Sequence, residues 1–204
     1  RNFAANHQVV TQMGNQVSSA SANRTPVRLL QERIVGDILS IHSINPKSWG
    51  RMSPLPGGSD PVPEGLDWDL WLGVGKERPF LKGEFHPSNW RKRIGYGTGT
   101  LGDMGCHIYH PWFLGLGLKA PTSITSLGNA PVDAFNWPTD CKVQYVFPGN
   151  ELTGKQPFDF TWYDGSQTPP PEVAQALGGA KNIPKSGSIV LGTEGALTIP
   201  HGGA

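Results

Sequence analysis

Glycine and proline set the strongest limit on the fold of this chain. The sequence has 27 glycines and 19 prolines among 204 residues, and both numbers are above average usage. Glycine weakens a helix by about 0.5–1 kcal/mol relative to alanine, and proline interrupts helices. The apolar residues, 37% of the chain, must therefore be buried by short helices and strands. We expect a loop-rich α/β protein rather than a helical bundle.

Charge and cysteine content exclude some partners and leave the compartment open. A formal net charge of +1 gives no reason to expect a nucleic-acid or membrane surface, and no apolar run approaches the ~20 residues of a membrane span. Seven tryptophans and six histidines fit a concave site for a polar small molecule. Cys106 and Cys141 neither require nor exclude a disulfide. The chain is expected in the cytoplasm, or in the periplasm if an export signal precedes Arg1.

The first 45 residues show a strand–helix–strand pattern. Residues 7–14 form a short β-branched run that predicts a buried strand. A helix is expected from the cap at Thr25 to the glycine cap at Gly36, and residues 37–44 predict a second strand. This order is typical of a parallel pair with a right-handed crossover. It indicates the end of a parallel Rossmann-type domain.

The remaining residues predict an α+β domain. A long loop is expected over 45–65, then a short helix over 65–73 that docks Trp68 and Trp71, and a glycine-containing helix over 101–117. Strands are expected at 122–128, 141–147, 158–163, 188–192 and 195–199. No helices separate them, so we expect an open, mainly antiparallel sheet with flanking helices. Its uncovered face predicts a homo-oligomer, a dimer or tetramer.

The segment GTGTLGDMGCHIYHP places Asp103 and His107 four residues apart. On a helix they share one face, where the carboxylate would hydrogen-bond the imidazole, set its tautomer and prepare a general acid/base. The alternative is an ordinary helix-stabilising pair worth about 0.2–0.5 kcal/mol. Gly99, Gly102 and Gly105 favour the catalytic interpretation, because they leave room for a flat ring beside the pair.

Other candidate residues surround this segment. Trp90 is suited to stacking on a sugar ring and Arg91 to gripping a phosphate or hydroxyl, although a core tryptophan with a solvated arginine explains them equally well. His86, His107 and His110 invite a metal interpretation, but zinc sites show closed ligand sets, and we expect no metal. GTGTLG resembles a dinucleotide fingerprint, but no strand leads into it and no acidic residue follows at the required distance.

Several segments together resemble one enzyme family. They are VVTQMGNQ, RLLQERIVGDI, VPEGLDWDLWLG, HPSNWR, GTGTLGDMGCHIYHP, GLKAPTSI and FTWYDG. The chain is similar to the Gfo/Idh/MocA oxidoreductases, and within them to the sugar or inositol dehydrogenases of environmental bacteria. The likeness runs nearly end to end and is most specific from Trp90 to Pro111.

The resemblance implies a function and roles for individual residues. Members combine a Rossmann domain that binds NAD or NADP with a C-terminal α+β domain. They transfer a hydride between the nicotinamide and a carbinol of a sugar, cyclitol or glycoside. The residues implied are Asp103 and His107 as catalytic carboxylate and proton-transferring imidazole, Trp90, Arg91 and His110 at the substrate, and Asn15 and Gln16 beside the nicotinamide.

Departures from the family pattern keep alternatives open. The Rossmann glycine motif and the lysine of the family's E-K-P segment are not in this sequence, and His110 stands where many relatives carry aspartate. We therefore expect a fragment that is inactive alone, with residues 1–45 ending the cofactor domain and residues 46–204 forming most of the catalytic domain. Two alternatives are an NAD-dependent glycosidase that oxidises its substrate transiently and a non-catalytic carbohydrate-binding or assembly module.

Overall fold

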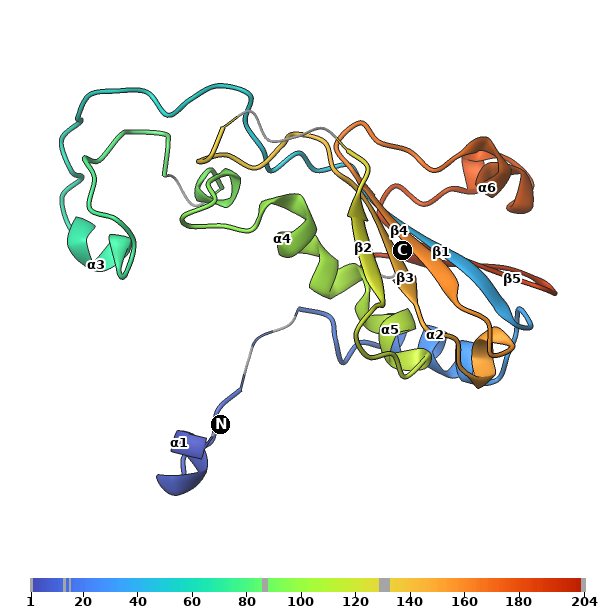
Figure 1. Cartoon of the computed structure of the whole chain (residues 1–204). Helices are drawn as coiled ribbons and strands as arrows, with labels where there is room; N and C mark the ends of the chain where they lie inside the picture. Colours follow the sequence, from blue (N-terminus) through green and yellow to red (C-terminus); the bar gives the residue numbers. More distant parts are fainter. Residues whose placement is uncertain (1, 13, 15, 86–87, 129–132, 203–204) are drawn as a thin grey trace.

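One six-stranded sheet organises the structure, a computed structural model that describes residues 2–12, 14, 16–85, 88–128 and 133–202. The strand order is β2-β3-β4-β1-β5-β6 (Figure 1). The strands are β1 (Ile38–Asn45), β2 (Ser123–Ser126), β3 (Lys142–Phe147), β4 (Phe158–Asp164), β5 (Gly187–Gly192) and β6 (Gly195–Pro200). Strands β1 and β4 pair in parallel, and the other neighbouring strands pair antiparallel. This confirms the open, mainly antiparallel sheet and the five strands expected after residue 121.

The helices are short, and not all of them touch the sheet: the first and the third lie away from it (Figure 1). They are α1 (Asn2–Asn6), α2 (Ser21–Gln31), α3 (Trp68–Leu72), α4 (Gly99–Ile108), α5 (His110–Gly115) and α6 (Pro171–Ala176), with 3-10 turns at η1 (Trp90–Lys92), η2 (Glu151–Thr153) and η3 (Ala180–Asn182). Helices α4 and α5 lie along one face of the sheet, and α2 packs against α5. Within the described residues, no helix has the length and apolar character needed to cross a membrane.

The strand expected over residues 7–14 is wrong. Residues 9–12 and Gly14 have no regular secondary structure, and Val10 is 97% exposed. A β-branched run becomes a strand only where a neighbouring strand supplies hydrogen-bond partners, and none pairs with it in the described part of the chain.

The parallel partner of β1 is therefore not a preceding strand but β4, far along the sequence. Strand β1 lies in the middle of the sheet, between β4 and β5. Residues 38–45 thus share one sheet with the strands after residue 121, across the boundary expected at residue 45. The assignment of the residues before β1 to a cofactor domain stays a prediction.

Helix α2 ends before the expected glycine cap. Its last turn closes with Arg33 in the left-handed region at φ +58°, while the N–H of Ile34 donates to Leu29 and that of Arg33 to Leu30. This is a Schellman ending, usually built on glycine. The guanidinium of Arg33 donates to Asp37 and to the Glu151 carbonyl. We infer that these bonds hold the unusual backbone.

The main core lies between the sheet and helices α2, α4 and α5. Trp112 of α5 and Trp162 of β4 are fully buried there, and the Trp112 indole N–H donates to Ser188 Oγ at 3.1 Å. Phe160 packs on Trp112 with ring centroids 4.6 Å apart. These large apolar residues on the sheet face fix the positions of α4 and α5. The two helices carry Asp103, His107 and His110.

The opposite sheet face is only partly covered. At one end Val173 of α6 packs on Ile44, Tyr163 and Ile189. Elsewhere the face is polar: His42 Nδ1 lies 3.1 Å from the Tyr163 hydroxyl, and Gln144 donates to Asp159. Burial lowers the pKa of His42 to about 4. The expected self-association through this face stays a prediction.

Helix α3 docks two indoles, as predicted. Trp68 and Trp71 stack with ring centroids 4.8 Å apart, and Phe80, Phe85 and Tyr96 surround them. The Trp68 indole N–H donates to the Arg78 carbonyl at 2.8 Å. This aromatic cluster gives residues 68–96 a small core of their own, although little of the segment is helix or strand.

The glycines before and within α4 serve internal packing. A Cβ on Gly97 would lie 2.5 Å from the Arg91 Cα, and one on Gly99 would lie 3.0 Å from the Trp137 ring. A Cβ on Gly102 would overlap the Thr98 side chain, and one on Gly105 would contact Tyr109. We had expected Gly99, Gly102 and Gly105 to leave open surface for a ligand. Trp137, Thr98 and Tyr109 take up the space directly beside their Cα atoms, while Gly99 and Gly102 also line a cavity between α4 and the sheet.

Gly97→Ala therefore tests the packing role. The new methyl group would meet the Arg91 backbone, which has little freedom to move, so we expect a loss of about 1–3 kcal/mol in the free energy of unfolding. Gly95→Ala is the matched control, because a Cβ there meets nothing within 4 Å and should change stability by less than about 0.5 kcal/mol. Urea denaturation measures both. Equal midpoints for the two variants would refute the packing explanation.

Candidate functional site

Helix α4 brings the two residues of the D-x-x-x-H pattern to one side of the domain. It begins at Gly99, after the close approach of Gly97 to η1, and runs over the apolar sheet face through Met104 and Ile108, which are buried. Asp103 and His107 alternate with these buried positions and remain partly exposed. Their spacing of one helical turn leaves both accessible to a molecule outside the domain.

Asp103 pairs with an arginine rather than with His107. Arg91 Nε donates to Asp103 Oδ1 at 2.8 Å. The guanidinium lies over the Trp90 ring, 4.7 Å from its centroid, and over the Trp49 ring at 5.5 Å. The expected Asp103–His107 hydrogen bond is thus wrong: a guanidinium gives a carboxylate a stronger, charge-assisted bond than a neutral imidazole does. Arg91 thus contacts both Trp90 and Asp103, and the roles expected for these three residues stay predictions.

His107 takes its orientation from the N-terminal loop. Its Nδ1 lies 3.3 Å from the Gln16 carbonyl oxygen. A carbonyl oxygen only accepts hydrogen bonds, so the contact requires the proton on Nδ1 and leaves the Nε2 lone pair free to accept a proton. The expected tautomer control is therefore exerted by a backbone carbonyl rather than by Asp103.

The same loop also reaches α5. His110 Nε2 lies 3.2 Å from the Ser18 hydroxyl. The segment Gln16–Ser18 thus contacts both His107 and His110, and the roles expected for Gln16 and His110 stay predictions. Asn15, the other residue expected beside a nicotinamide, lies outside the described residues.

Three further residues of this site escaped the sequence analysis. Lys47 Nζ lies 3.2 Å from Met104 Sδ, and the His201 ring lies 5.7 Å from the His107 ring. Burial lowers the pKa of His201, and the nearby His107 and Lys47 lower it further. Trp49 is the third. Lys47 and Trp49 were hidden because residues 45–65 were interpreted only as a loop. They follow the carboxyl end of β1, which is a common position for ligand-binding groups.

The described residues do not assemble a metal site. No group of three or more His, Cys, Asp or Glu side chains comes together among them. His107 and His110 contact different residues of the loop, Gln16 and Ser18. His86, the third histidine of the metal interpretation, lies outside the described residues.

The glycine segment that leads into α4 packs closely against other parts of the protein. A dinucleotide site needs open space beside the glycines, so that the pyrophosphate approaches the backbone at a helix N-terminus. Here Arg91, Trp137 and Thr98 occupy the space beside Gly97, Gly99 and Gly102. The rejection of GTGTLG as a dinucleotide fingerprint stays a prediction from the sequence.

Comparison with known proteins gives a match to a family model that covers residues 48–141. Residues 48–141, which include α3, α4 and the Asp103–His107 pattern, match the family model described as oxidoreductase family, C-terminal alpha/beta domain, of the Gfo/Idh/MocA group. The chain has no match among curated proteins. The matched domain supports a general oxidoreductase role. Residues 48–141 are thus similar to the C-terminal domain of the Gfo/Idh/MocA oxidoreductases, and the mixed, mainly antiparallel sheet with its flanking helices is consistent with that alpha/beta domain.

Proposed function

We propose that this chain forms the substrate side of an NAD(P)-dependent oxidoreductase that acts on a carbinol of a sugar, cyclitol or glycoside. The observation that carries the proposal is the orientation of His107: the Gln16 carbonyl binds its Nδ1, so Nε2 is available as the proton acceptor. General acid/base catalysis near neutral pH requires a group of this kind.

The residues around His107 suit a polyol. The Arg91–Asp103 pair offers both donor and acceptor groups to hydroxyls, and the Trp49 and Trp90 rings hold the Arg91 guanidinium in place beside it. In the oxidation direction, a hydroxyl proton passes to His107 Nε2 as the carbinol carbon gives up its hydride. A bound nicotinamide would accept that hydride, and residues outside this chain's glycine segment would hold it.

His107→Ala tests the catalytic assignment in the protein together with its dinucleotide-binding domain. We expect kcat to fall by about 10²–10⁴, the usual contribution of a positioned acid/base, with cofactor affinity unchanged. His42→Gln is the matched control, because His42 lies on the opposite sheet face beside Tyr163. Steady-state kinetics that follow nicotinamide absorbance measure kcat for both variants, and only His107→Ala should be slow. A His107→Ala enzyme within a few-fold of wild type would rule out the assignment.

The same experiment separates the proposed reaction from the glycosidase alternative. A dehydrogenase produces a net change in nicotinamide absorbance, whereas a glycosidase with transient oxidation releases a free sugar without one. Sugar binding without any turnover would instead indicate a non-catalytic module.

Residues 1–204 alone should not hold the cofactor tightly. The glycine-rich Rossmann turn that holds the pyrophosphate is not in this sequence. We expect isothermal titration calorimetry to show no binding of NAD(H) in the micromolar range. Micromolar affinity would contradict the proposal that the cofactor site lies elsewhere.

A further inference from the structure

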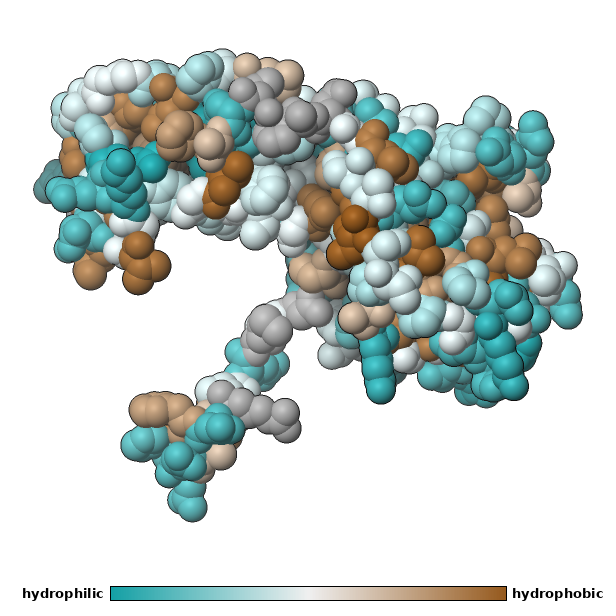
Figure 2. All heavy atoms as spheres, viewed as in Figure 1, coloured by the Kyte–Doolittle hydropathy of each residue, from teal (hydrophilic) through white to brown (hydrophobic). Residues whose placement is uncertain are grey.

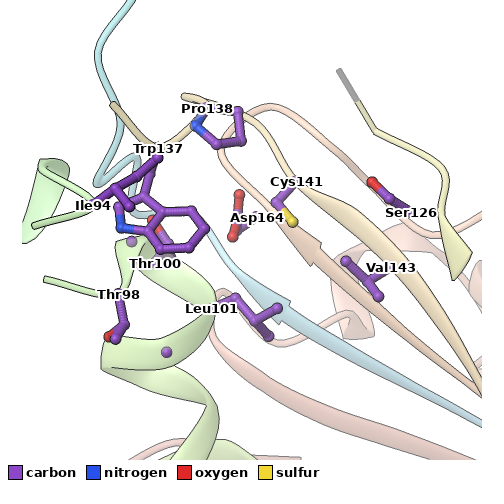
Figure 3. Close-up of a pocket in the computed structure, with 12 residues that line it drawn as sticks. Ile94, Thr98, Thr100, Leu101, Ser126, Trp137, Pro138, Cys141, Val143 and Asp164 are labelled. Atoms are coloured by element: carbon purple, nitrogen blue, oxygen red, sulfur yellow. The ribbon is translucent and has the colours of Figure 1, made fainter. Parts of the chain in front are cut away.

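A pocket lies on another side of α4, between its first turn and the sheet. It has a volume of about 400 Å³ and is bounded by Thr98 and Leu101 of the α4 region, the Trp137–Pro138 loop, and Cys141, Val143 and Asp164 at the ends of β3 and β4 (Figure 3). We call it the Trp137 pocket. Neither Asp103 nor His107 lines it, so it is separate from the proposed catalytic site. Its volume is in the range of small-molecule sites.

The apolar wall of the pocket is held in place by the protein itself. The Trp137 indole N–H donates to the Gly97 carbonyl at 2.9 Å, and the ring lies against Gly99. Leu101 and Val143 complete an apolar lining. The glycine segment therefore supports the indole that forms one side of the pocket. The apolar wall is already fixed before a ligand binds, so binding does not require the Trp137 side chain to become ordered.

One polar group in the pocket lacks a partner in the fold. Asp164 is 2% exposed and lies between Trp137 and Cys141 in Figure 3. Its Oδ2 accepts from the Trp162 indole N–H at 2.8 Å, but its Oδ1 is buried without a hydrogen bond. An unsatisfied buried polar atom costs about 1–3 kcal/mol, and more when it is charged. The fold thus places a carboxyl oxygen without a hydrogen-bond partner beside an apolar cavity, at a cost in stability.

The charge in the pocket favours a cation. Among the described residues that line it, Asp164 is the only acidic side chain and none is basic. The Cys141 thiol stays neutral, because burial raises its pKa to about 12. An ammonium group would satisfy the free carboxylate oxygen, and the adjacent Trp137 ring would attract it through its π face. Both interactions strengthen in an apolar surrounding.

We propose that the Trp137 pocket binds a small organic amine, with its ammonium group on Asp164 Oδ1 and its apolar body between Trp137, Leu101 and Val143. The ligand class is defined by one cationic donor attached to an apolar group about the size of an aromatic ring. The site does not depend on the proposed dehydrogenase function.

Benzylamine is a suitable probe, with toluene as its uncharged counterpart. In two-dimensional NMR of the chain we expect saturable shifts of the indole N–H signals of Trp137 and Trp162. The Trp68 indole, bonded to Arg78 in the aromatic cluster, is the internal control and should not move. Toluene should bind at least ten-fold more weakly. Absence of saturable shifts at millimolar benzylamine, or equal affinity for toluene, would overturn the proposal.

Asp164→Asn tests the carboxylate directly. The amide oxygen can still accept from the Trp162 indole, but the charge is lost, so we expect at least a ten-fold weaker affinity for benzylamine. Asp159→Asn on the same strand is the matched control, because Asp159 is exposed and hydrogen-bonded to Gln144. Unchanged affinity of a folded Asp164→Asn chain would also overturn the proposal.

The pH dependence gives a test that needs no variant. Burial raises the pKa of Asp164 to about 6, and the nearby Asp140 raises it further, while the Trp162 indole N–H and the nearby backbone N–H of Cys141 oppose this by favouring the carboxylate. Asp164 therefore becomes neutral as the pH falls below about 6, while the amine stays protonated. Benzylamine affinity should fall in that range. Constant affinity between pH 5 and 8 would contradict the proposed contact with Asp164.

Discussion

The close approach of a glycine backbone to two neighbouring segments determines how this domain is built. Gly97 lies against the Arg91 backbone, and Gly99, at φ +61°, lies against the Trp137 ring. Side chains at these positions would push α4 away from both. The helix that emerges presents Asp103 and His107 on one side and borders the Trp137 pocket on another. Two separate chemical environments thus depend on one tightly packed turn.

An ionic network extends this constraint to the loop that carries Trp137. The nearly buried Arg93 guanidinium donates to Glu84 and to Asn136, and Arg51 also pairs with Glu84. The two guanidinium groups hold the pKa of Glu84 below its usual value. Asp133 accepts from the backbone of Asn136, directly before Trp137. The network therefore connects Glu84, which precedes Phe85 of the aromatic cluster, to Asn136, which precedes Trp137 in the wall of the pocket.

Local patterns predicted much of the fold, and long-range pairing accounts for the errors. Strands β2 to β6 and helix α3 follow from alternating apolar residues, turn residues and paired tryptophans, which are properties of neighbouring positions. The partner of β1 is not such a property: β4, which pairs with it, lies more than a hundred residues away. Residues 7–14 show the converse, because a good strand composition stays irregular where no neighbouring strand pairs with it.

Spacing likewise predicted which site residues share a helix face, but not which atoms bond. Asp103 and His107 lie one turn apart as expected, yet the stronger donor Arg91 takes the carboxylate and Gln16 takes the imidazole. These partners come from other segments, as do Lys47 and His201. Buried Asp164 lies at the end of an apolar strand, and nothing in its neighbours along the chain reveals that one oxygen lacks a partner.

The tautomer of His107 is the most direct test of this account, because the proposed proton acceptor exists only if Nδ1 carries the proton. Nitrogen-15 NMR of the imidazole, at a pH where the ring is neutral, distinguishes the two tautomers. We predict the Nδ1–H form, with an unprotonated Nε2, as the contact with the Gln16 carbonyl requires. A neutral ring protonated at Nε2 would contradict the account.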